Sequence, residues 1–69
     1  MTAAQITGVV EAFDAAVGLG VIRTADGDAV PFHCIEIADG SRTIQVGAAV
    51  TADRIAKLGR YEAASIRPA

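Results

Sequence analysis

Residues 18–33 read GLGVIRTADGDAVPFH, and this stretch decides the fold. The apolar, β-branched run over 18–24 predicts one strand, and the run over 29–37 predicts the next. Between them, Asp26-Gly27 is a hairpin turn, because Gly tolerates a positive φ and Asp hydrogen-bonds its own backbone. Pro31 lacks an N–H donor, so its strand is expected at a sheet edge or with a bulge. The stretch therefore predicts an antiparallel hairpin.

Similar short apolar segments lie on both sides of this hairpin. Residues 6–13 predict an earlier strand, and residues 61–66 predict a final strand that Pro68 ends. Residues 38–43 form a polar loop. This spacing of strands and turns is typical of a small all-β protein, either a barrel or a sandwich.

The segment from Ala48 to Arg60 is ambiguous. Thr51 can cap a short helix that Gly59 would end, and local propensity favours that helix. Alternation of apolar and polar residues favours a strand only weakly, since Arg54 breaks the pattern. On local evidence this segment is predicted to be helical.

The chain is short and its apolar side chains are small. It has 69 residues, 52% of them hydrophobic, but Ala supplies 15 of these. One domain over residues 1–69 is expected, with a thin core and no deep catalytic cleft. No apolar run is long enough to span a membrane, and no basic flank with an apolar stretch indicates a signal peptide. Cys34 is the only cysteine, which fits a reducing, cytoplasmic compartment.

Charge is unevenly distributed along the chain. Six basic and eight acidic residues give a net charge of −2, which argues against a partner bound by charge alone. Residues 1–39 hold one basic and six acidic residues, whereas residues 40–69 hold five basic and two acidic residues. Two interpretations stay open: a solvated surface of mixed sign, or a basic rim built by the later half.

The order of these motifs resembles the bacterial cold-shock domain family over nearly the whole chain. The matching segments are 8–14 (GVVEAFD), 18–22 (GLGVI), 30–34 (VPFHC), 40–47 (GSRTIQVG) and 59–68 (GRYEAASIRP). The resemblance implies a small, five-stranded, antiparallel OB-type barrel. It also implies a strand over residues 48–55, against the local helix prediction. Gly18 and Gly20 would lie where the second strand curls, because a small barrel needs sharp bends.

The family binds single-stranded RNA or DNA on a platform of exposed aromatic rings, and this chain departs from that platform. Only Phe13 and His33 stand at matching aromatic positions. Elsewhere the family's aromatic or basic residues are replaced, by Glu11, Ala12, Val17, Leu19, Val21, Pro31, Cys34 and Ser41. Each stacked base is worth about 1–3 kcal/mol, so the losses predict weak binding.

Two hypotheses of function follow. In the first, the chain is a divergent cold-shock-like protein with an RNA-chaperone or gene-regulatory role. Its nucleic-acid contacts would be Phe13, His33, Arg23, Arg42 and Arg60. In the second, the barrel is a protein-binding or self-associating module, homodimer included, that uses an apolar patch. That patch would comprise Leu19, Val21, Val30, Pro31 and Cys34.

Enzymatic and metal chemistry are not expected. His33 and Cys34 are adjacent on a predicted strand and would point to opposite faces, so they should not form a nucleophile–base pair. One His and one Cys do not make a zinc site, and Gly18-Leu19-Gly20 lacks the rest of a phosphate-binding loop. No cofactor is expected.

Overall fold

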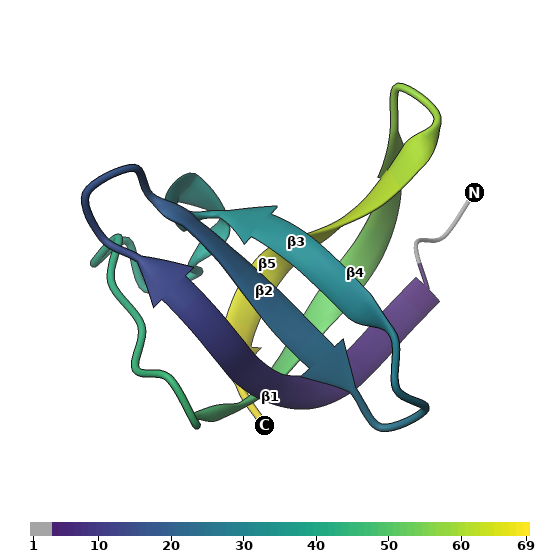
Figure 1. Cartoon of the computed structure of the whole chain (residues 1–69), viewed down its shortest axis with the longest axis horizontal. Coiled ribbons are helices and arrows are strands. Elements are labelled where there is room, and N and C mark those ends of the chain that lie inside the picture. Colours follow the sequence, from purple (N-terminus) through teal and green to yellow (C-terminus); the bar gives the residue numbers. More distant parts are fainter. Residues whose placement is uncertain (1–3) are drawn as a thin grey trace.

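The computed structural model describes residues 4–69, apart from the side chain of Lys57, so residues 1–3 of the expected domain lie outside the description. Five strands and one short 3-10 helix make up the fold (Figure 1). They are β1 (Ala4–Asp14), β2 (Leu19–Thr24), β3 (Ala29–His33), η1 (Cys34–Glu36), β4 (Ala49–Lys57) and β5 (Arg60–Pro68). The strand order is β3-β2-β1-β4-β5, and every neighbouring pair is antiparallel.

The sheet curls until its two outer strands meet. β3 and β5 contact each other, and a bridge joins Ile37 to Ile66 just beyond β3. The Ala38 N–H donates to the Ile66 carbonyl oxygen at 2.8 Å. Figure 1 shows β5 crossing behind β2 and β3. The fold is therefore all-β and matches the small OB-type barrel that the sequence predicted.

The core is built from alternate residues of the strands. Its largest fully buried side chains are Phe32, Ile22, Ile66 and Val10, and Ala52 fills a narrow position on β4. Phe32 is only 2% exposed and lies opposite Gly20 of β2. Because side chains alternate between faces along a strand, the neighbours of these residues point to solvent.

Two glycines allow the strands to approach closely. A Cβ on Gly8 would lie 2.3 Å from the Arg23 carbonyl oxygen, and a Cβ on Gly20 would lie 2.3 Å from Cζ of Phe32. β1 also carries a bulge between Val10 and Ala12. Together these features let β1 and β2 bend around the core, as a small closed barrel requires.

The segment that local propensity predicted as a helix is strand β4. It pairs with β1 on one edge and with β5 on the other, so its backbone groups are satisfied by the sheet. Ala52 is fully buried in this arrangement. The pairing of β4 with two neighbouring strands outweighs its local preference for a helix, which is worth about 0.5 kcal/mol per residue. The local helix prediction is wrong, and the strand implied by the family resemblance is correct.

The third strand is shorter than expected. It ends at His33, and residues Cys34–Glu36 form η1 instead of continuing the strand to residue 37. β3 lies at the end of the sheet order, as Pro31 predicted. The Cys34 N–H donates to the Gly18 carbonyl oxygen at 2.7 Å. Because hydrogen-bonding residues alternate along an antiparallel strand, the backbone nitrogen of Pro31 points away from β2, where no donor is needed.

Candidate functional site

The outward side of β1, β2 and β3 forms one continuous face. Ala12 lies opposite Val21, and Val21 lies opposite Pro31. One layer further along, Leu19 lies between Asp14 and His33. The side chains of this face are therefore small or aliphatic, with His33 and Asp14 at one end.

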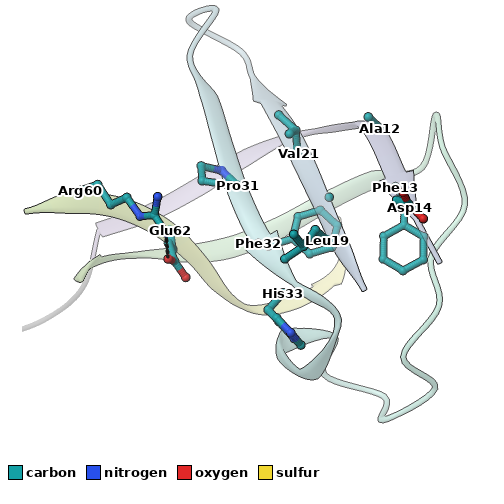
Figure 2. A pocket seen from close by; sticks show the side chains of 11 residues that line it. Ala12, Phe13, Asp14, Leu19, Val21, Pro31, Phe32, His33, Arg60 and Glu62 are labelled. Atoms are coloured by element: carbon teal, nitrogen blue, oxygen red, sulfur yellow. Dashed lines mark ion pairs between the residues drawn. The ribbon is translucent and has the colours of Figure 1, made fainter. Parts of the chain in front are cut away.

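An open groove of about 610 Å³ runs over this face (Figure 2). β5 supplies one wall, because Arg60 and Glu62 stand beside Pro31. The lining residues are Ala12, Phe13, Asp14, Leu19, Gly20, Val21, Pro31, Phe32, His33, Arg60 and Glu62. The groove thus combines an aliphatic floor with two carboxylates, one arginine and two aromatic side chains near its surface.

Phe13 belongs partly to the core and partly to the groove. Its ring is half-buried and lies parallel to that of Phe32, with centroids 6.0 Å apart and an interplanar angle of 4°. One side of the Phe13 ring is therefore occupied by packing. The same ring also lines the groove.

His33 is exposed at the end of β3 and caps η1. Its Nδ1 accepts the Ile35 N–H at 3.4 Å, so the neutral ring carries its proton on Nε2, the outer nitrogen. Nδ1 also lies 3.8 Å from the Cys34 sulfur. The expectation that these two side chains point to opposite faces is wrong, because the strand ends at His33. Nδ1 therefore faces both the Ile35 N–H and the Cys34 thiol.

The arginines do not converge into a basic rim. Arg60 lines the groove and pairs with Glu62 at 3.6 Å, and its side chain is 75% exposed. Arg23 makes two bonds to Glu11, with Nε–Oε1 at 3.0 Å and Nη2–Oε2 at 2.9 Å, and does not line the groove. Arg42 lies in the loop after η1 and outside the groove lining.

The 'Cold-shock' DNA-binding domain family matches residues 6–69 of the sequence. The chain belongs to the cold-shock domain family. This family binds nucleic acids, and the family relationship proposed from the sequence motifs is confirmed. No curated protein matches the sequence significantly.

Three of the five nucleic-acid contacts predicted for this cold-shock domain meet at the groove. They are Phe13, His33 and Arg60, which come from β1, β3 and β5. Arg23 and Arg42 are not brought to it. The Glu11 carboxylate that holds Arg23 lies in the bulge of β1, and the contact joins residues twelve positions apart in the chain.

The predicted apolar patch needs one correction. Leu19, Val21 and Pro31 line the groove, and Leu19 is 52% exposed. Val30, however, is 3% exposed and belongs to the core. Because Pro31 faces outward, its strand neighbour must face inward. Cys34 is half-buried outside the groove lining, and its sulfur lies 2.6 Å from where a Cβ on Gly18 would stand.

Two charged residues of the groove were not among the sequence-based candidates. Asp14 ends β1, and Glu62 lies two residues beyond Arg60 on β5. The spacing of Arg60 and Glu62 was the available signal, since residues two apart on a strand share a face. Both carboxylates make the rim of the groove less attractive to phosphate than a basic rim would be.

The carboxylates with altered pKa values lie outside the groove. A hydrogen bond from the Thr24 hydroxyl lowers the pKa of Asp26, and the Ser41 backbone N–H lowers the pKa of Asp39. Both belong to turns. Within residues 4–69 as described, no group of His, Cys, Asp or Glu side chains could hold a metal ion. The same residues include no helix long and apolar enough to cross a membrane.

Proposed function

We propose that the groove binds single-stranded RNA or DNA weakly, in an RNA-chaperone or gene-regulatory role. The observation that carries this proposal is the meeting of Phe13, His33 and Arg60 at one groove of a cold-shock domain. A base can stack on an exposed aromatic ring while a neighbouring arginine contacts phosphate. We place this activity in the cytoplasm, since a single free thiol suits a reducing compartment.

Weak binding follows from the chemistry of the groove. Leu19, Val21 and Pro31 offer no π-face for stacking, and losing three stacked bases weakens binding by about 100-fold or more. Arg60 pairs with Glu62, and this carboxylate offsets part of its attraction for a phosphate. The carboxylates of Asp14 and Glu62 repel the backbone of the ligand.

Fluorescence anisotropy with labelled oligo-U and oligo-dT tests this proposal. Binding is expected in the micromolar range at low salt, and it should weaken at physiological salt and in His33→Ala and Arg60→Ala. Arg67→Ala is the matched control, because Arg67 pairs with Asp53 outside the groove. No binding at concentrations up to about 100 μM at low salt, where phosphate contacts are strongest, would refute the proposal.

A second candidate function is contact with a protein through the aliphatic floor. The observation in its favour is that Leu19 and Pro31 are exposed next to each other on β2 and β3. Exposed apolar surface of this kind often marks a partner site. Leu19→Glu should then abolish self-association in sedimentation experiments, whereas Arg60→Glu should leave it intact.

A further inference from the structure

The wall that β5 adds to the groove is charged, whereas the groove floor is apolar. Arg60 and Glu62 share one face of β5, because residues two apart along a strand point the same way. Figure 2 shows both side chains beside Pro31 at the groove. A flat base that lies on the floor therefore presents its hydrogen-bonding edge to this wall.

Glu62 is the more constrained member of the pair. Its side chain is 19% exposed, whereas that of Arg60 is 75% exposed. Nη2 of Arg60 lies 3.6 Å from Oε2 of Glu62, which makes an ion pair that is longer than a hydrogen bond. A carboxylate has about four lone-pair sites and can accept two parallel N–H donors. Glu62 can thus accept hydrogen bonds from a base while Arg60 stays beside it.

The other carboxylate of the groove, Asp14, is used differently. It ends β1, and its Oδ1 accepts the Ala16 N–H at 3.0 Å within the turn that leads to β2. On the outward face it lies next to Leu19, one of the aliphatic residues of the floor. Asp14 therefore holds a turn, and Glu62 is the groove carboxylate better placed to meet the edge of a base.

The bases differ in what their Watson–Crick edges offer to a carboxylate. An ionised carboxylate only accepts hydrogen bonds. Guanine presents two donors side by side, N1–H and the N2 amino group. Uracil and thymine present one N–H between two carbonyl oxygens, and cytosine and adenine present an amino group beside an accepting ring nitrogen. Acceptors of the base repel those of the carboxylate, so guanine alone fits.

We propose that the Glu62 carboxylate selects guanine in a single strand, by accepting N1–H and the N2 amino group at the β5 wall of the groove. This inference rests on the proposed function, because it requires a strand in the groove. Contacts to phosphate carry no sequence information, whereas contacts to base edges do. The carboxylate that repels phosphate is thus the residue that determines specificity.

Fluorescence anisotropy with oligo-U heptamers that differ only in the central base tests this proposal on the wild-type chain. The strand with a central guanine should bind about tenfold more tightly than the all-uracil strand, because a bidentate contact discriminates by about this factor or more. Strands with a central adenine or cytosine should bind no more tightly than the all-uracil strand. Inosine keeps N1–H but lacks the N2 amino group, so a central inosine should lose most of the gain.

The variant Glu62→Gln separates selection of a base from general support of the fold. It removes the charge and turns one acceptor into a donor, so the preference for guanine should fall from about tenfold to about threefold or less. Binding of the all-uracil strand should become slightly tighter, because a charge that repels phosphate is gone. A purely structural role would weaken both strands alike.

Asp53→Asn is the matched control. Asp53 pairs with Arg67 at 3.5 Å outside the groove, so its loss should leave the preference for guanine at about tenfold. Circular dichroism checks that both variants are folded. The inosine comparison uses the wild-type chain and decides the point without any variant.

Four results would overturn the proposal while the all-uracil strand still binds and the proposed function stands. The guanine strand binds no more tightly than the all-uracil strand, the inosine strand equals the guanine strand, adenine or cytosine is preferred, or Glu62→Gln keeps the full preference. Binding of none of the heptamers up to about 100 μM at low salt would instead refute the proposed function, and this inference with it.

Discussion

The inward and outward faces of β1, β2 and β3 differ in their side chains. On the inward side, Phe32, Ile22 and Val10 are almost completely buried. On the outward side, Leu19 and Pro31 line the groove, at positions where the family resemblance implied aromatic residues. The two sets alternate along the same strands, so one backbone carries both. The barrel therefore depends on the inner set, whereas the outer set can change without loss of the fold.

The largest expected effect comes from emptying the inner side. Phe32→Ala should lower the free energy of unfolding by about 3–5 kcal/mol, because it removes the largest buried side chain from a thin core. Urea denaturation followed by circular dichroism measures this change. Leu19→Ala is the matched outward truncation and should change stability by less than about 0.5 kcal/mol. Equal losses in the two variants would remove the distinction between the two sides.

A smaller effect is expected from crowding the inner side. Gly20→Ala places a Cβ 2.3 Å from Cζ of Phe32 and 2.9 Å from the Ala12 carbonyl oxygen. Overpacking of this kind costs about 1–3 kcal/mol of unfolding free energy. In a Phe32→Leu background the shorter side chain should relieve part of that loss. Without any relief in the double variant, the contact with the backbone oxygen would be the main source of strain.

Restoring rings to the outer side should change binding and leave stability almost unchanged. Leu19→Phe and Val21→Phe each add a stacking surface, so each should tighten binding of oligo-U by about tenfold, or about 1.4 kcal/mol. The free energy of unfolding should stay within about 0.5 kcal/mol of wild type. Thr51→Phe, outside the groove, is the control for nonspecific binding by an added aromatic ring. Unchanged affinity in both groove variants would mean that nucleic acid does not lie over this face.

The turn of the β4–β5 hairpin lies on neither face, and a substitution there is expected to give a smaller gain in stability. Leu58 has a φ of 50°, which is unfavourable for Leu, and its side chain is fully exposed. Leu58→Asn should raise the free energy of unfolding by about 0.5–1 kcal/mol, because Asn-Gly suits this turn. Thermal or urea unfolding measures the gain. Leu58→Ala is the control and should not stabilise to the same degree, since Ala also disfavours a positive φ.

The smallest effect concerns pH. The pKa of Asp26 is lowered from 3.8 mainly by the hydrogen bond from the Thr24 hydroxyl. A lowered pKa means that the ionised carboxylate stabilises the fold above pH 3.8, and that this contribution is lost as the pH falls through the lower folded-state value. Asp26→Asn should therefore be slightly less stable than wild type at pH 6. The difference between the two should shrink toward pH 2, and a constant difference would contradict this linkage.

Local chemistry was enough to predict much of the fold. Asp26-Gly27 predicted the β2–β3 turn, and Pro31 predicted an edge strand, because both act through their own φ angles and donors. The motif order then predicted the family and its barrel.

Other features were decided by contacts between distant segments. Strand β4 exists because β1 and β5 satisfy its backbone, although its own residues favour a helix. Arg23 forms an ion pair with Glu11 on the neighbouring strand and so does not reach the groove. His33 and Cys34 turn toward each other because β3 ends at His33 instead of continuing to residue 37, as the apolar pattern indicated.

By itself, the sequence determined the turns, the edge strand and the family, since these depend on residues near one another in the chain. Only the tertiary structure decided which candidate residues share the groove. Phe13, His33 and Arg60 come from three strands, and their meeting depends on the closure of the barrel. Closure also brings in Asp14 and Glu62, whose charge opposes the ligand. Register and ion pairing across strands are long-range properties, and residue patterns along one strand do not contain them.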